Sequence, residues 1–435
     1  MVKWIKVFKQ LRSKHILVLG DFILDTYTFG LVSRISPEAP VPILKVEKES
    51  SFPGGAGNVV LNLLSLGCTV IPVGRVGKDR EGDNLLDNFR EQGINHHGLF
   101  QDNSYITPKK NRIISDNQQM IRIDNEQVTK ISPKIEDKIL SFIKEHIHEV
   151  KVLAISDYAK GTLTNSLIRS VVSLAKEYSI PVLIDPKGKD FSKYKGCTLI
   201  KPNLKEAQEA SGLEDGATSK EIASKLFEIT NCEQLIITLS QQGISLFSSE
   251  GNVDNFSVQM KDVMDVTGAG DTVFAILCMG IANRVALPLL IPIANIAAGI
   301  AIEQLGCFRV SLSDIADRLV MNCLSSKVFD ESNLFPFREL IKKHSCIIFQ
   351  IEEEPNISDR CLFRTIMAIK NVEKKKKMIV SIKEGSVEKD LLNLLNSLIE
   401  VDYIFMHQQN SLNKLVQDSG EEIKIYRCNN YHSEV

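Results

Sequence analysis

The sequence predicts an α/β protein in which helices cover both faces of a mostly parallel sheet. Two observations predict it. Short runs rich in β-branched residues alternate with longer segments of helical periodicity, which is typical of such sheets. Each of these runs also ends beside Gly, Asp, Asn or Ser. Since ligands bind outside the carboxyl ends of the strands in these sheets, we expect the active site there.

The composition indicates a protein of two or three domains that folds without disulfides. The 435 residues are 43% hydrophobic and 24% charged, and nine cysteines occur without a Cys-x-x-Cys pair. No secretory signal precedes the first apolar run, so we expect a cytoplasmic protein. A net charge of −2 and a single Trp indicate no nucleic-acid partner. The one basic run, residues 374–377, predicts a solvated loop.

The expected strands begin near the N-terminus and follow one another along the first half of the chain. Between about residues 28 and 51 the pattern changes to short extended pieces broken by Pro37, Pro40 and Pro42. This change indicates a small β element inserted after the first strand, for which a lid is one interpretation. The expected strands of the main sheet are residues 16–19, 70–73, 151–155, 181–184, 197–200 and 235–238.

One uncharged segment, residues 285–302, resembles a membrane span in length. It just reaches the minimum of roughly 17 residues that crossing requires. However, Pro288, Pro292 and Asn295 interrupt it, and residues 294–299 are mostly small. We therefore expect a buried helix and no membrane partner.

Residues 265–271 form the most informative motif, an Asp-Val-Thr-Gly-Ala-Gly-Asp sequence that leads into an apolar helix. Glycines let the backbone turn with several N–H groups pointing one way, and the positive end of the helix reinforces them, so the motif predicts an anion hole. Asp271 would then take a proton from an attacking hydroxyl during phosphoryl transfer. A glycine-rich turn capped by Asp271 explains these seven residues equally well.

Two motifs near the front of the chain offer ligands for a polyol. Residues 20–25 place Asp21 and Asp25 at the end of the first expected strand, although Asp21 is also a common turn residue. Residues 53–58 combine Gly54 and Gly55 with Asn58 at a helix start, where a substrate can lie against the backbone. A plain loop with an N-cap is the alternative for this second motif.

A third motif, residues 201–207, has an Asn-x-x-Glu spacing. Asn203 and Glu206 share one face at a helix start and would hold the water shell of Mg²⁺, which keeps most of its waters in proteins. A capping box needs the same two residues, and taken alone it is the better explanation.

The order and spacing of these motifs resemble the ribokinase-like (PfkB) sugar kinases. Within that family, several segments are similar to the kinase half of the bifunctional heptose 7-phosphate kinase/heptose 1-phosphate adenylyltransferases of lipopolysaccharide synthesis. The resemblance covers roughly residues 10–322 and implies a three-layer sandwich with a small β lid. The segments that carry it are residues 33–42, 53–56, 117–122, 156–161 and 183–188.

The resemblance implies phosphorylation by ATP and Mg²⁺ of the anomeric hydroxyl of D-glycero-β-D-manno-heptose 7-phosphate. Asp271 would be the base, and Gly268, Ala269 and Gly270 would stabilise the transferred phosphoryl group. The segment Asn203, Leu204, Lys205 and Glu206 would organise Mg·ATP. The sugar would be held by Asp21, Asp25, Gly54, Gly55 and Asn58 under a lid around Arg34, and the lid would also join two copies in a homodimer. The candidates for binding the substrate's own phosphate are Arg34, Arg112, Arg122, Lys160 and Lys187.

Two other functions stay open at this stage: a kinase for a different sugar, and an idle sugar-phosphate-binding or scaffold protein. Two residues depart from the family pattern. Leu239 stands where many relatives have Arg, which removes a polar contact near the nucleotide. Cys307 begins a Cys-Phe-Arg sequence where small hydroxyl residues are usual, so potassium activation is not assumed.

The largest departure is the tail, where the resemblance implies a nucleotidyltransferase domain. The tail has no His-x-Gly-His signature, and its expected place, residues 351–356, carries three consecutive carboxylates that would repel a triphosphate. Its histidines, His344, His407 and His432, are isolated. The strand and helix rhythm persists, so we expect a shortened Rossmann-like α/β domain over residues 336–430 without adenylyltransferase activity.

Overall fold

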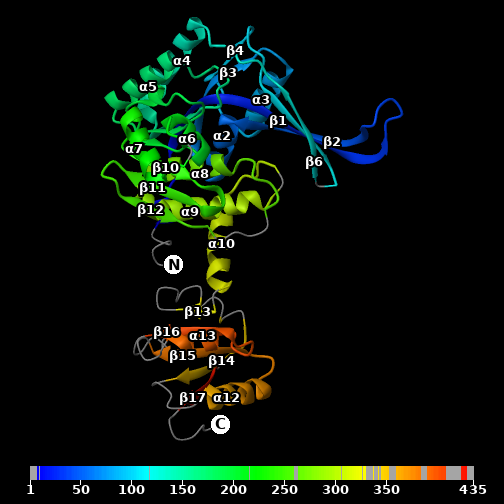
Figure 1. Ribbon diagram of the computed structural model, residues 1–435, viewed down its shortest axis with the longest axis vertical. Helices are drawn as coiled ribbons and strands as arrows, with labels where there is room; N and C mark the ends of the chain where they lie inside the picture. Colours follow the sequence, from blue (N-terminus) through cyan, green and yellow to red (C-terminus); the bar gives the residue numbers. More distant parts are fainter. Residues whose placement is uncertain are drawn as a thin grey trace. The chain divides into compact units, whose positions relative to one another are not determined.

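The computed structural model contains two compact units, Val7–Ile315 and a C-terminal unit that begins at Ala316. All elements of the predicted active site belong to the first unit (Figure 1). The described residues are 7–8, 10–116, 118–214, 216–258, 263–304, 306–325, 327–329, 337, 341, 344–351, 359–383, 389–407 and 423–428.

The first unit is built on one large, mostly parallel sheet, as predicted. Its strands follow the order β12-β11-β10-β9-β8-β7-β1-β3-β4, and only β11 runs antiparallel to its neighbours. Each predicted strand is present, and apart from β1 the ends differ from the prediction by a few residues. The strands are β1 (His15–Ile35), β3 (Thr69–Gly77), β4 (Leu99–Asp102), β7 (Val152–Ser156), β8 (Val182–Asp185), β9 (Leu199–Ile200), β10 (Gln234–Thr238), β11 (Ile244–Ser248) and β12 (Val253–Phe256).

Helices cover both faces of this sheet and complete three layers. On one face, buried residues of α4 (Pro133–His146), α5 (Asn165–Glu177), α6 (Leu204–Ser211) and α7 (Ser219–Thr230) join alternate strand residues in one core. Since side chains alternate across a strand, the intervening residues meet the second layer. That layer contains α2 (Ala56–Ser65), α3 (Arg80–Glu91), α8 (Ala269–Ala282) and α9 (Leu287–Ile302).

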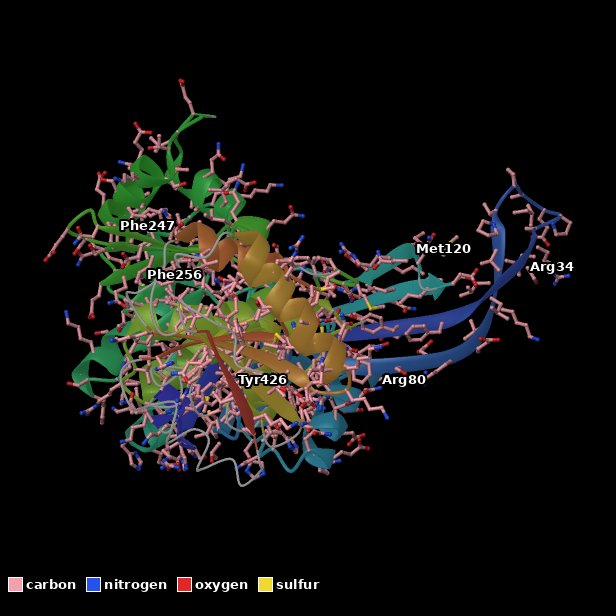
Figure 2. All side chains as sticks on the ribbon, turned by 90° about the horizontal axis from the view of Figure 1, so that it is seen from below. Arg34, Arg80, Met120, Phe247, Phe256 and Tyr426 are labelled. Atoms are coloured by element: carbon pink, nitrogen blue, oxygen red, sulfur yellow. The ribbon has the colours of Figure 1, made fainter. Side chains whose placement is uncertain are left out.

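Strand β1 extends far beyond its predicted end and belongs to two sheets. Its first part pairs with β3 and β7, and from Phe22 it pairs with β2 (Pro42–Gly55). Together with β5 (Lys109–Ser115) and β6 (Gln118–Asn125), these strands form a second sheet, the lid sheet. The predicted β element is thus confirmed, and it is larger than the sequence indicates. Figure 2 shows its ribbon projecting from the first unit, with Arg34 near the far end.

The prediction that the first strand ends at Gly20 and Asp21 is wrong because this glycine serves close packing rather than a turn. A Cβ atom at Gly20 would lie 2.4 Å from the backbone oxygen of Ser156 in the neighbouring strand. Glycine therefore lets β1 and β7 approach while the strand continues.

Helix α9 confirms the prediction of a buried helix over residues 285–302. Pro288 lies in its first turn, where the missing N–H costs nothing, and Asn295 donates to the backbone oxygen of Phe256 at 3.0 Å. Within the described residues, no helix is both long enough and apolar enough to cross a membrane.

The C-terminal unit has a parallel sheet of order β13-β16-β15-β14-β17. Its strands and helices confirm the predicted rhythm, whereas the assignment to a shortened nucleotidyltransferase-like domain stays a prediction. Residues 352–358 and His432 lie outside the described residues. The elements are α10 (Leu312–Ser325), β13 (Val328–Phe329), β14 (Cys346–Ile351), α12 (Asp359–Val372), β15 (Lys377–Lys383), α13 (Lys389–Ser397), β16 (Tyr403–His407) and β17 (Lys424–Cys428).

Candidate active site

The predicted anion loop is a tight turn at the start of α8. Gly268 is the N-cap residue and has φ 82° and ψ −4°, a left-handed conformation that favours glycine. A Cβ atom at this position would lie 2.8 Å from Asn58 Nδ2. The carboxylate of Asp265 holds the turn by accepting from the amides of Thr267 at 2.9 Å and Gly306 at 3.1 Å. Both the conformation and the crowding therefore require glycine at 268.

The amides of this turn are largely uncommitted. The N–H of Ala269 reaches the Val266 oxygen at a long 3.4 Å. The N–H groups of Gly268 and Gly270 donate to no backbone oxygen in the described part of the chain. First-turn amides of a helix have no intrahelical partner, and they lie at its positive end. These amides are therefore available as hydrogen-bond donors.

Asp271 is buried in the first turn of α8, directly after these amides, with 6% of its surface exposed. One carboxylate oxygen accepts from Asn58 Nδ2 at 2.7 Å and the other from the Tyr158 hydroxyl at 2.7 Å. Burial raises the pKa of Asp271, while the two hydrogen bonds oppose the rise. A carboxylate with a raised pKa that is held by two donors is suited to act as a general base.

The two glycine motifs of the sequence meet at this carboxylate. Gly55, with φ 58°, is the N-cap of α2, which places Asn58 in the first turn of that helix. Asn62 donates to the side-chain oxygen of Asn58 at 3.2 Å and accepts from the Thr272 hydroxyl at 3.2 Å. These contacts connect α2 to α8 and orient the Asn58 amide toward Asp271.

Tyr158 has a role that the sequence analysis missed. It follows β7, and burial together with Asp271 raises the pKa of its hydroxyl, which therefore stays protonated and donates. The available signal was position, because Tyr158 comes just after the carboxyl end of a parallel strand.

Replacing Tyr158 by Phe is expected to move the acid limb of the pH–rate profile to higher pH. In the wild type, the hydrogen bond from Tyr158 lowers the pKa of Asp271. Without this bond the pKa rises, and the base stays protonated to higher pH. A shift of about one pH unit is expected for a hydrogen bond to a charged group. The profile of kcat/KM against pH measures it, and an unchanged acid limb would exclude Asp271 as the titrating group.

Lys201 and Asp185 form a second pair that the sequence analysis did not assign. Lys201 is 3% exposed, and its ammonium lies 3.0 Å from Asp185 Oδ1. A Cβ atom at Gly270 would be 3.8 Å from the same ammonium, so Lys201 lies against the anion loop. Burial, and then the charge of Asp271, raises the pKa of Asp185 to about 7, with Lys201 opposing. Both residues stand at the carboxyl ends of neighbouring strands, where ligand-binding residues are expected.

Asp21 is engaged within the protein. It is fully buried and lies inside β1. Its carboxylate accepts from the backbone amides of Tyr158 at 3.1 Å, Lys160 at 3.0 Å and Thr162 at 3.3 Å. Asp21 therefore holds the loop that carries Tyr158, and it contributes to the site through that loop.

Asp25 lies close to Gly54, as predicted, and to an arginine of the lid sheet. A Cβ atom at Gly54 would lie 1.9 Å from Asp25 Oδ2, so glycine is required at this contact. The other carboxylate oxygen accepts from Arg112 at 2.6 Å, and the guanidinium lies 5.3 Å from the ring centroid of Tyr27.

The Asn-x-x-Glu motif forms a capping box in the structure. Asn203 Oδ1 accepts from the Glu206 amide at 2.9 Å, and Glu206 Oε2 accepts from the Asn203 amide at 3.0 Å. Lys187 pairs with Glu206 Oε1 at 2.7 Å. Leu204 is 39% exposed, and Lys205 faces Glu209 at 4.0 Å. Among the described residues, no group of three or more His, Cys, Asp or Glu side chains is arranged to hold a metal ion.

Of the two remaining predicted substrate-binding residues, Lys160 lies near the site and Arg34 does not. The ammonium of Lys160 pairs with Glu126 Oε1 at 2.6 Å. Arg34 is exposed near the end of the lid ribbon (Figure 2). The hydrogen bonds of Asp271 come from Asn58 and Tyr158 instead.

Comparison with known proteins agrees with this fold. Residues 13–314 match the model of the pfkB family of carbohydrate kinases. The bifunctional protein HldE of Trichlorobacter lovleyi is 42% identical over 311 residues, which are 71% of this chain but only 63% of that protein. HldE of Helicobacter pylori is 34% identical over 436 residues, covering 97% of this chain and 93% of that protein.

Two solved structures show the same fold at low sequence identity. Arabidopsis thaliana ribokinase complexed with ribose and ATP has a TM-score of 0.55 at 17% identity, covering 71% of this chain and 99% of its own. Phosphofructokinase-2 from Escherichia coli in complex with potassium has a TM-score of 0.59 at 17% identity, with the same coverage. The first unit thus has the ribokinase-like fold. The chain belongs to the pfkB family of carbohydrate kinases, which confirms the predicted family.

Proposed function

We propose that this protein uses ATP to phosphorylate the anomeric hydroxyl of D-glycero-β-D-manno-heptose 7-phosphate, giving the 1,7-bisphosphate used in lipopolysaccharide core synthesis. One observation carries the proposal. The buried Asp271 carboxylate, held by Asn58 and Tyr158, directly follows the uncommitted Gly270 amide at the positive end of α8. In the proposed mechanism, Asp271 is the base and the neighbouring amides form the anion hole. The HldE relatives support the choice of sugar.

In this mechanism Asp271 accepts the proton of the anomeric hydroxyl while that oxygen bonds to the terminal phosphorus of ATP and the bond to ADP breaks. The amides of Gly268, Ala269 and Gly270 donate to the charge on the transferred phosphoryl group, each contributing roughly 3 kcal/mol by analogy with oxyanion holes. The ammonium of Lys201, next to the loop, adds to the same stabilisation.

Asn203 and Glu206 would hold Mg²⁺ through water, and the metal when bound would neutralise charge on the nucleotide phosphates. Glu206, which pairs with Lys187 at 2.7 Å, would have to release this partner to contact the water shell. Leu239, which replaces a polar residue of many relatives, contacts Gly243 through its backbone N–H at 2.8 Å and contributes only an apolar side chain here. ATP affinity is therefore expected to depend mainly on the anion loop.

The sugar would lie between the glycine motif and the lid sheet. Asp25 and Asn58 offer acceptors and a donor to its hydroxyls, and Gly54 and Gly55 leave the backbone accessible. Closure of the lid sheet would exclude water from the reaction. Since the reaction consumes ATP, we place the protein in the cytoplasm.

ADP release by the purified full chain tests the proposal. The assay compares heptose 7-phosphate, ribose, fructose and fructose 6-phosphate, with a reaction lacking sugar as the control for ATP hydrolysis. The highest kcat/KM is expected for heptose 7-phosphate. A higher value for another sugar would make the protein a different sugar kinase, and no release with any sugar would indicate an idle binding or scaffold protein.

We also propose that the C-terminal unit lacks adenylyltransferase activity. The absence of His-x-Gly-His from the sequence and the three carboxylates at residues 352–354 support this proposal. The alignment with the H. pylori relative extends into the unit, which favours a shared origin with the second domain of that bifunctional protein.

Truncation after Ser325 is expected to leave kinase activity within about twofold of the full chain. The site residues all lie in Val7–Ile315, and this truncation keeps α10 whole. The measurement is kcat/KM for the sugar, with the melting temperature as a check on folding. A folded but inactive truncated protein would show that the C-terminal unit takes part in catalysis.

We propose, finally, that the lid sheet joins two copies in a homodimer. All of β6 is exposed, including Met120, Ile121 and Ile123, and Ile35 near the end of the ribbon is 60% exposed. Apolar side chains gathered on one small sheet are typical of a protein interface.

A further inference from the structure

Two adjacent lysines of lid strand β5 have different surroundings. Successive side chains of a strand point to opposite faces, so Lys109 and Lys110 diverge. Lys109 lies 3.8 Å from Glu81 Oε1. Lys110 is half-buried, and no carboxylate of the described residues lies within ion-pair distance of its ammonium. A cation removed from water without a partner is costly unless a ligand supplies the opposite charge.

The Lys110 ammonium lies over the aromatic residue that holds the proposed base. Its distance to the ring centroid of Tyr158 is 5.8 Å. The hydroxyl of the same ring donates to Asp271 at 2.7 Å. Lys110 and Asp271 therefore lie against the same side chain, Tyr158.

Lys160 is a second cation at this place. Burial, and then repulsion from the Lys160 charge, lowers the pKa of Lys110. The nearby acids Asp25, Asp124 and Glu126 attract Lys110. Each of them has another partner: Asp25 pairs with Arg112 at 2.6 Å, Asp124 with Arg122 at 2.8 Å and Glu126 with Lys160 at 2.6 Å. Among the described residues, Lys110 is thus left without an ion pair of its own.

The other cations considered for the substrate phosphate are less available. Arg112 and Arg122 form the ion pairs just described, and Lys187 pairs with Glu206 beside the nucleotide motif. Arg34 lies near the end of the lid ribbon (Figure 2).

We propose that Lys110, with Lys160 beside it, binds the phosphate group that the sugar substrate already carries, and that the Tyr158 ring sets the distance between this phosphate and the reacting hydroxyl. The inference rests on the proposed function, since it assumes a phosphorylated sugar. It makes Lys110 a specificity-determining residue: the site selects sugars whose phosphate lies at the opposite end from the anomeric hydroxyl, and it discriminates against the unphosphorylated sugar.

The test compares wild type with Lys110→Met, which keeps most of the aliphatic stem, and with Lys110→Arg, which keeps the charge. Lys109→Met is the matched control on the opposite face of the strand. For Lys110→Met, KM for heptose 7-phosphate is expected to rise by about 10- to 100-fold, the usual value of a hydrogen bond to a charged group. In the same variant, KM for ATP and kcat/KM for unphosphorylated heptose should stay unchanged. Lys110→Arg should show a smaller rise in KM for heptose 7-phosphate, and Lys109→Met should behave as wild type.

A wild-type KM in Lys110→Met, or an equal loss with both sugars, would overturn the proposal. Calorimetric measurement of sugar binding without ATP distinguishes a failure of this inference from a failure of the proposed function. If wild type does not turn over heptose 7-phosphate, binding of fructose 6-phosphate and ribose 5-phosphate is compared with that of their parent sugars. A preference for the phosphorylated forms that Lys110→Met abolishes would support the anion site even then, and no preference in wild type would reject it. Should Lys110→Met fail to fold, Lys110→Gln replaces it in both measurements.

Discussion

Replacing Asp271 by Asn is expected to lower kcat by about 10²- to 10⁴-fold, the usual contribution of a positioned base. The change removes the proton acceptor while keeping the shape of the side chain, and an Asn oxygen can still accept from Asn58. Folding should not suffer. Burial raises the pKa of Asp271 above its ordinary value of 3.8, so at neutral pH the ionised carboxylate lowers the free energy of unfolding. A neutral Asn does not carry this cost.

The measurements are kcat for the sugar and the melting temperature. Asp87→Asn is a matched control, because this carboxylate is 60% exposed on α3 and pairs with Arg90. It should leave both values unchanged. Near-normal turnover in Asp271→Asn would remove this residue from the mechanism.

Gly268→Ala is expected to lower kcat by about 10²-fold, comparable to the loss of an oxyanion-hole donor. An alanine at φ 82° is strained by about 1–2 kcal/mol. Its Cβ would also lie 2.8 Å from the Asn58 side chain. The backbone must therefore move, and the amides of Gly268 and Gly270 lose their alignment.

Gly299→Ala is the control for a glycine substitution as such. Gly299 lies in α9, where a Cβ atom would meet nothing within 4 Å. Alanine is the better helix former by about 1 kcal/mol, so stability should stay equal or rise and kcat should not change. If Gly268→Ala folds and turns over normally, the amides of the loop do not stabilise the transferred phosphoryl group.

Much of the fold could be predicted because the period of the hydrophobic residues indicates where the strands and helices lie. Six strands of the main sheet, the buried helix α9 and most elements of the C-terminal unit follow from local patterns, whereas β4, β11, β12 and β13 were not predicted. The lid sheet could only partly be predicted, since β6 is exposed along its whole length and both β5 and β6 have little apolar alternation. Gly20 shows a second reason: in a sequence a glycine needed for close packing looks the same as one needed for a turn.

The candidate site residues could be predicted where the backbone conformation or close packing requires glycine. Gly268 and Gly54 mark places where only glycine fits, and Asp271 follows from the first of them. Tyr158, Lys201 and Lys110 could not be found in this way. They are ordinary residue types, and their importance depends on contacts between segments far apart in the chain, such as the hydrogen bond from Tyr158 to Asp271.

The position of the new phosphate tests the account most directly. Phosphorus NMR of the reaction of the full chain with ATP and heptose 7-phosphate should show a second phosphate on the anomeric oxygen, together with one ADP for each sugar consumed. A product phosphorylated at any other oxygen, or ATP cleaved to free phosphate with the sugar unchanged, would contradict the assignment of Asp271 and its neighbouring amides.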